Sequence, residues 1–86
     1  MTIIESQQLQ ASINNGLCWL IEGAAGRRTM AALAAGDVML GTKPQFDYWG
    51  NRVPARSEVK PDTKGSEALV LKAHGRRWAD LLKAAD

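Results

Sequence analysis

The residues with the most informative chemistry lie together between Lys43 and Arg56. This stretch holds three of the five aromatic residues, two of the three prolines and three basic residues. Aromatic and arginine side chains contribute most of the binding energy in protein interfaces. Glutamine and asparagine can bind adenine edges, and lysine and arginine can neutralise phosphates. The stretch therefore predicts a recognition surface, for a protein or for DNA.

Reactive side chains elsewhere do not follow a catalytic pattern. The single histidine, His74, lies 56 positions after the single cysteine, Cys18, so the two are not at nucleophile–base spacing. The glycines near residue 25 lack the Gly-Lys-Ser/Thr of a phosphate-binding loop. The carboxylates are scattered, and no cluster has metal-ligand spacing. We predict a non-enzymatic protein without cofactor or metal, in which Cys18 is buried and unreactive and His74 is structural.

Two local structures fit residues 43–56. In the first, Gly50-Asn51 forms a type II′ turn, and a β-hairpin pairs Trp49 with Arg52, Tyr48 with Val53 and Phe46 with Ala55. Trp49 and Arg52 would then make a cation–π contact. In the second, Thr42 and Gln45 form a capping box, and a helix over residues 43–49 ends at Gly50.

The sequence PQFDYWGNRVPA, residues 44–55, carries a resemblance. It resembles the end of the recognition helix and the following loop in Cro-type phage repressors, a helix-turn-helix family. The run Ala31–Ala34 resembles the first helix of their pair. The spacing from Ala34 to Trp49 is 15 positions, about two more than in that family, and Gly36-Asp37 falls where the turn is not expected. The resemblance implies DNA binding by a short recognition helix.

Two functions follow, each with its own residues. A small phage-type modulator would bind a host protein, and inhibit or redirect it, through Phe46, Tyr48, Trp49, Arg52 and Arg56. A helix-turn-helix transcriptional regulator would contact DNA through Lys43, Gln45, Tyr48, Asn51 and Arg52. We favour the protein partner, because the helix-turn-helix spacing departs from the family and the net charge is only +2. Core positions for Phe46 and Trp49 are the third alternative.

Composition sets broad limits on the rest of the chain. Eighty-six residues with 45% hydrophobic content fit one globular domain, residues 1–86. Residues 1–26 carry a charge of −2 and residues 27–86 a charge of +4. No apolar run approaches the roughly 20 residues that span a bilayer, and no signal peptide is evident. With one cysteine we expect a cytoplasmic protein; the oligomeric state stays open, a dimer included.

The secondary-structure pattern predicts helices at both ends of the chain. Thr2 and Glu5 form a capping box for a helix that ends near Asn15-Gly16, with Ile3 or Ile4, Leu9 and Ile13 on its inner face. Residues 17–21 read as a buried strand or helical turn. Near the other end, Trp78, Leu81, Leu82 and Ala85 have helical spacing.

Shorter elements are expected between these helices. Thr29 caps a short helix with Met30, Leu33 and Ala34 inside, ended by Gly36; strands are expected at residues 38–40 and 67–73, and residues 57–66 form a polar loop. We predict an α+β single domain, a short antiparallel sheet with N-terminal and C-terminal helices. The alternative is a mainly α-helical helix-turn-helix domain.

Overall fold

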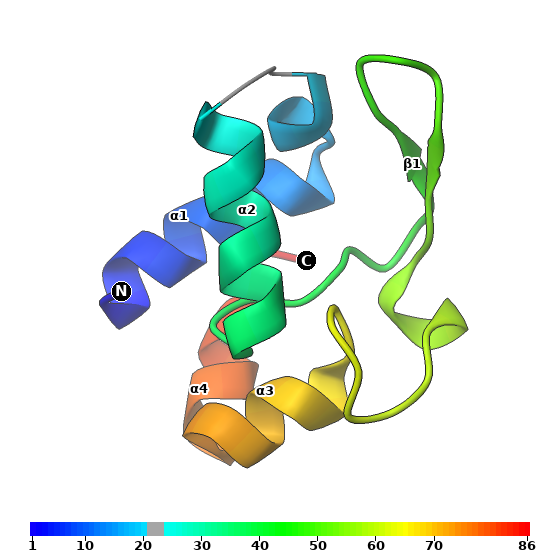
Figure 1. The fold of residues 1–86 in the computed structure, drawn as a ribbon. Helices are drawn as coiled ribbons and strands as arrows, with labels where there is room; N and C mark the ends of the chain where they lie inside the picture. The colour runs from blue at the N-terminus through cyan, green and yellow to red at the C-terminus, as the bar shows by residue number, and fades with distance from the viewer. Residues whose placement is uncertain (21–23) are drawn as a thin grey trace.

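The computed structural model describes residues 1–20 and 24–86. Two of its helices, α1 (Ile3–Asn14) and α2 (Ala24–Ala35), come first in the chain, and α3 (Glu67–His74) and α4 (Arg76–Lys83) come last. A hairpin of β1 (Gln45–Phe46) and β2 (Arg52–Val53) lies between them, beside α2 (Figure 1). Two 3₁₀ helices complete the described part, η1 (Leu17–Leu20) and η2 (Arg56–Glu58). The predicted mixed fold is confirmed at this level, and it is mostly helical.

Helix α1 begins as predicted, but the predicted inner face is wrong in part. Thr2 donates its backbone N–H to Glu5 Oε1 at 2.9 Å, and Thr2 Oγ1 accepts from the backbone N–H of Glu5 at 3.1 Å. The buried residues are Ser6, Gln10 and Ile13, whereas the side chain of Ile4 is 64% exposed. A polar residue, Gln10, is therefore at the centre of the core face.

Gln10 binds the backbone of Met39 through both ends of its side-chain amide. Its Nε2 donates to the Met39 carbonyl at 2.8 Å, and its Oε1 accepts from the Met39 N–H at 2.9 Å. Residues 38–40 are buried, but they do not form the predicted strand. The side chain of Gln10 supplies bonds that a neighbouring strand would otherwise supply, and the Leu40 N–H donates to the Gly65 carbonyl at 3.0 Å, so the segment is bonded without joining a sheet.

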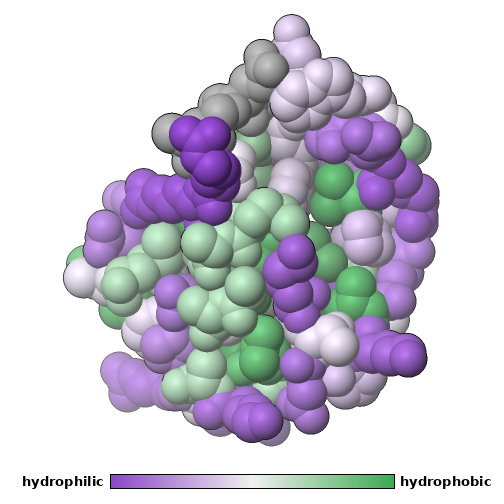
Figure 2. All heavy atoms as spheres, viewed as in Figure 1, coloured by the Kyte–Doolittle hydropathy of each residue, from purple (hydrophilic) through white to green (hydrophobic). Residues whose placement is uncertain are grey.

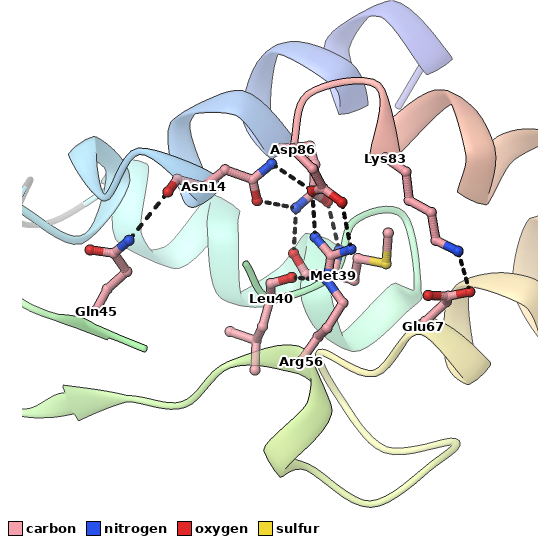
Figure 3. Close-up of polar contacts among 9 residues, drawn as sticks. Asn14, Met39, Leu40, Gln45, Arg56, Glu67, Lys83 and Asp86 are labelled. Carbon is pink, nitrogen blue, oxygen red and sulfur yellow. Dashed lines mark hydrogen bonds and ion pairs between the residues drawn. The ribbon is translucent and has the colours of Figure 1, made fainter. Parts of the chain in front are cut away.

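Arg56 joins the segment after the hairpin to the core and to the end of α4 (Figure 3). Its Nε donates to the carbonyl of Leu40 at 2.7 Å, and its two terminal nitrogens donate to the Asp86 carboxylate at 3.0 and 2.8 Å. Asn14 also donates to Asp86, at 3.0 Å. Segments far apart in the sequence thus meet at one charged cluster.

The region around α2 differs from its prediction in three respects. Residues 17–20 form the 3₁₀ helix η1, so the helical-turn alternative is confirmed, but Cys18 is buried while Leu17 and Leu20 are exposed. Ile21, the last residue of the predicted run, lies outside the described residues. Helix α2 begins before Thr29, so Thr29 is a buried mid-helix residue and not a cap. Ala32 and Leu33 face the core, while Met30 and Ala34 are exposed.

Residues 67–73 form helix α3 and not the predicted strand. Ser66 caps this helix, since its Oγ accepts from the backbone N–H of Leu69 at 3.1 Å. The weak alternation of leucines favours a strand, whereas the Ser66 cap and the good helix formers that follow it favour a helix. The stabilisation of the helix is the larger of the two. Before it, residues 57 and 58 of the predicted polar loop belong to η2 (Arg56–Glu58), and turns follow up to Gly65.

The predicted C-terminal helix is confirmed as α4, with Leu82 fully buried and Trp78 half-buried. The ring of Trp78 stacks on His74 at 3.8 Å between centroids, and its Nε1 donates to the Asp37 carbonyl at 2.9 Å. His74 also contacts Asp37 Oδ1 at 2.6 Å. His74 therefore links α3 to the end of α2, in the structural role that was predicted.

Replacing Gln10 by methionine tests the importance of its amide. Gln10→Met leaves a buried N–H and a buried carbonyl of Met39 without partners, at about 1–3 kcal/mol for each group. We expect the free energy of unfolding, from urea denaturation, to fall by about 2–4 kcal/mol. Gln8→Met, at an exposed position of the same helix, should change it by less than about 0.5 kcal/mol. Equal effects of the two changes would contradict this role.

Cys18 offers a second test, of burial. Desolvation raises the pKa of its thiol to about 11, against a smaller opposing effect of a hydrogen bond with Thr29. At about pH 8 only about one thiol in a thousand is then ionised, and the thiolate is the reactive form. We expect iodoacetamide to modify the folded protein at least about a hundredfold more slowly than the urea-unfolded chain. Similar rates in the two states would show that Cys18 is accessible.

Candidate interaction surface

Residues 45–53 form a β-hairpin, so the helix predicted over residues 43–49 is wrong. The hairpin prediction is confirmed in type, but its register differs. Gln45 lies opposite Val53, and Phe46 lies opposite Arg52. The predicted partners Trp49 and Tyr48 are instead in the connecting loop, residues 47–51. The strands are therefore shorter, and the loop longer, than a two-residue turn allows.

Asp47 determines this loop. Its Oδ1 accepts from the backbone N–H groups of Trp49 at 2.9 Å and Asn51 at 2.8 Å, and its Oδ2 accepts from Asn51 Nδ2 at 3.3 Å. The Asp47 carbonyl accepts from the Gly50 N–H at 3.0 Å. Gly50 has a φ of +80°, a conformation that glycine adopts at little cost. One carboxylate thus organises the whole tip, which we call the hairpin tip (residues 47–51).

The hairpin is also attached to the body of the protein. The backbone N–H of Tyr48 donates to the carbonyl of Trp19, in η1, at 2.7 Å. Gln45 Nε2 donates to the carbonyl of Asn14, at the end of α1, at 3.2 Å. These bonds hold the tip on two elements of the N-terminal part of the chain. The loop is therefore positioned before any partner arrives.

The three aromatic side chains of this hairpin point into solvent. Phe46 is 62% exposed, Tyr48 58% and Trp49 65%. The rings of Tyr48 and Trp49 meet edge to face, 5.2 Å apart between centroids. The alternative in which Phe46 and Trp49 are core residues is therefore wrong. Tyr48 and Trp49 on the ordered loop, together with Phe46 on β1, are exposed apolar rings of the kind that marks interaction sites.

The two predicted arginine anchors differ in their surroundings. Arg52 is half-exposed beside the tip, and its guanidinium pairs with Glu58 at 2.8 Å. The pKa of Glu58 is lowered, first by the hydrogen bond from the Ala55 N–H and then by Arg52. Arg56 has a side chain only 10% exposed, and it is committed to Leu40 and Asp86. The assignment of Arg56 as a partner-binding residue is therefore corrected, because its role is to hold the fold.

The residues predicted to contact DNA are not arranged for base recognition. The side-chain nitrogens of Gln45 and Asn51 donate to Asn14 and Asp47, so the groups needed for adenine are occupied within the molecule. Lys43 is exposed on the approach to β1 and is not part of a helix. In the residues that the structure describes, no helix carries this set.

A groove of about 310 Å³ lies between α2 and the hairpin, and sequence reasoning did not predict it. In Figure 2 the hollow beside the face of α2 contains hydrophobic side chains, in green. We call this the hairpin groove; its lining residues are Trp19, Met30, Leu33, Leu40, Asp47, Arg52, Val53, Pro54, Val59 and Lys64. The residues come from five separate segments, so no local pattern marks the groove. The apolar run at residues 17–20 was the available signal, and it was interpreted as core.

Residues 1–20 and 24–86 contain neither a membrane-spanning helix nor a metal-binding cluster of side chains. No helix in these ranges has the length and apolar character needed to cross a bilayer. Nor do three or more histidine, cysteine or acidic side chains gather there in a way that could hold a metal ion.

The tip can be tested through its organising carboxylate. Asp47→Ala removes the acceptor for the Trp49 and Asn51 amides, and we expect those amides to exchange with deuterium at least about tenfold faster. Asp47→Asn keeps the Oδ1 acceptor and is the matched control, with exchange close to that of the original protein. Unchanged exchange in Asp47→Ala would show that the loop does not depend on this side chain.

Comparison with known proteins gives no match. No protein-family model matches the chain, and no curated protein or solved structure does so. The resemblance of residues 44–55 to Cro-type repressors therefore stays a prediction. What bears on function is the geometry of the hairpin and its groove.

Proposed function

We propose that this chain is a non-enzymatic interaction protein whose hairpin tip binds a partner protein. The observation that carries the proposal is the exposure of Phe46, Tyr48 and Trp49 on one fixed hairpin. Leaving three large rings in water is unfavourable for a free protein, at about 25 cal/mol for each Å² of apolar surface. Covering them with a partner would recover that free energy.

The rigidity of the tip supports the same role. A flexible loop loses conformational entropy when it binds, and a loop already ordered loses less. Asp47 fixes the backbone of the tip, and the Tyr48–Trp19 bond fixes its place on the body. Leu17 and Leu20 of η1 are also exposed, and they extend the apolar surface from the element to which the tip is attached.

Such a protein acts by occupying a surface. A modulator that inhibits or redirects its target needs a complementary shape and a few anchors, and no reactive group. The rings of the tip supply the anchors, and Arg52 supplies a charged rim beside them. Binding of this kind forms and breaks no covalent bond.

The alternative, a helix-turn-helix DNA regulator, has less support. Its recognition segment is a hairpin, and its two base-reading amides, on Gln45 and Asn51, are engaged within the chain. A gel-shift titration against mixed genomic DNA addresses it directly. We expect weak binding that is lost at physiological salt, as for non-specific phosphate contacts. Tight binding of one sequence at that salt would favour the regulator over the modulator.

Trp49→Ser tests the proposed anchor. The tagged protein is incubated with lysate of its source cells, and captured proteins are quantified by mass spectrometry. Loss of a central anchor costs about 2 kcal/mol or more, which corresponds to about 30-fold in Kd. We therefore expect the captured partner to be strongly depleted for Trp49→Ser. Its far-ultraviolet circular dichroism should be unchanged, because the ring is not part of the core.

Ile4→Ser is the matched control, since Ile4 is as exposed as Trp49 but lies on α1. It should retain the partner. A partner retained by Trp49→Ser, or lost equally in both variants, would remove the tip from the binding surface.

A further inference from the structure

The hairpin groove has an apolar floor directly beside the proposed binding tip. Leu33 of α2 and Leu40 are buried at its base, and Met30, Val53 and Val59 form its sides. A volume of about 310 Å³ is at the small end of the range for ligand pockets. It suits one large apolar side chain better than a drug-sized molecule. The floor is an uncovered part of the core, and an apolar group would bind there by the hydrophobic effect.

The charged residues of the groove differ in whether they already have a partner within the chain. Asp47 has its carboxylate turned to the amides of the tip, and Arg52 is paired with Glu58. Lys64 also lines the groove, but its ammonium has no ion pair or hydrogen bond to any residue in the described ranges. The uncommitted charge at the rim is therefore a single cation.

From this arrangement we infer that the hairpin groove receives one large apolar side chain of the partner protein, with a carboxylate next to it in the partner's sequence. The apolar side chain would cover Leu33 and Leu40, and the carboxylate would meet Lys64. This inference rests on the proposed function and specifies the partner's chemistry. Lys64 is exposed, so a partner carboxylate would add a modest, screened attraction and a basic neighbour would be repelled, which favours an acidic segment.

Three blocked hexapeptides that differ at two central positions isolate the two requirements. Acetyl-Gly-Ser-Phe-Asp-Ser-Gly-amide carries both groups, a Phe-Asn version lacks the charge, and an Ala-Asp version lacks the apolar side chain. Each is titrated into the ¹⁵N-labelled full chain, and amide shifts are followed by NMR. We expect the Phe-Asp peptide to shift saturably the amides of the groove-lining residues. The Phe-Asn peptide should bind about 1.5- to fivefold more weakly, the range for one exposed ion pair, and the Ala-Asp peptide should not saturate.

Variants of the protein assign these effects to the groove. Lys64→Gln should remove the difference between the Phe-Asp and Phe-Asn peptides, while Lys60→Gln, an exposed lysine outside the groove, should preserve it. Met30→Glu places a negative charge on the groove wall and should lower the affinity for the Phe-Asp peptide at least about tenfold. Ala34→Glu, at an exposed α2 position that does not line the groove, is its control.

The results separate the groove from the tip. Equal affinity of the Phe-Asp and Phe-Asn peptides, shifts that map away from the groove, or no saturable shift at millimolar peptide would each overturn the inference. If that happens while Trp49→Ser still loses the lysate partner, the tip remains the binding site and the groove does not. If the peptides bind as expected but Trp49→Ser retains the partner, the groove stands and the proposed role of the tip fails.

Discussion

The fold depends on the buried side-chain amide of Gln10, which forms the backbone hydrogen bonds that a neighbouring strand would otherwise form. Residues 38–40 cross the centre of the molecule, where water cannot satisfy their backbone groups. Gln10 donates to and accepts from Met39, and the carbonyl of Leu40 accepts from Arg56. Without these side chains, the segment would need a sheet, or the core would carry unpaired polar groups at a cost comparable to much of a small domain's stability. The helices can pack around this buried segment because Gln10, Arg56 and the Gly65 carbonyl form hydrogen bonds with its backbone.

The parts of the fold that were predictable have a local cause. Thr2 and Glu5 form their capping box within one turn. The apolar spacing from Trp78 to Ala85 is that of one face of a helix. Such signals act over three or four residues, and a sequence displays them directly. The hairpin at residues 45–53 was only one of two predicted alternatives, because Gly50 is equally suited to a turn and to the end of a helix.

What could not be predicted depends on contacts between distant residues. Gln10 looks like an exposed polar residue of α1, because its partner Met39 is 29 positions away. The register of the hairpin was missed because Asp47 accepts from the loop amides and lengthens the loop beyond a two-residue turn. Arg56 was predicted to be a surface anchor, because its contacts with Leu40 and Asp86 exist only in the folded chain. The hairpin groove belongs to the same class, since its walls come from segments that meet only in the folded chain.

The contact between α1 and α4 also affects the order in which the chain folds (Figure 1). The bond from Asn14 to Asp86 spans 72 positions, and that from Gln7 to the Leu81 carbonyl spans 74. Pairing of this kind closes nearly the whole chain into one loop, and loop closure makes such contacts late and slow to form. On the ribosome, α1 emerges first but cannot complete its packing until α4 has been synthesised. Until then Gln7 and Asn14 lack their partners near the C-terminus, so the packing of α1 is among the last to be completed.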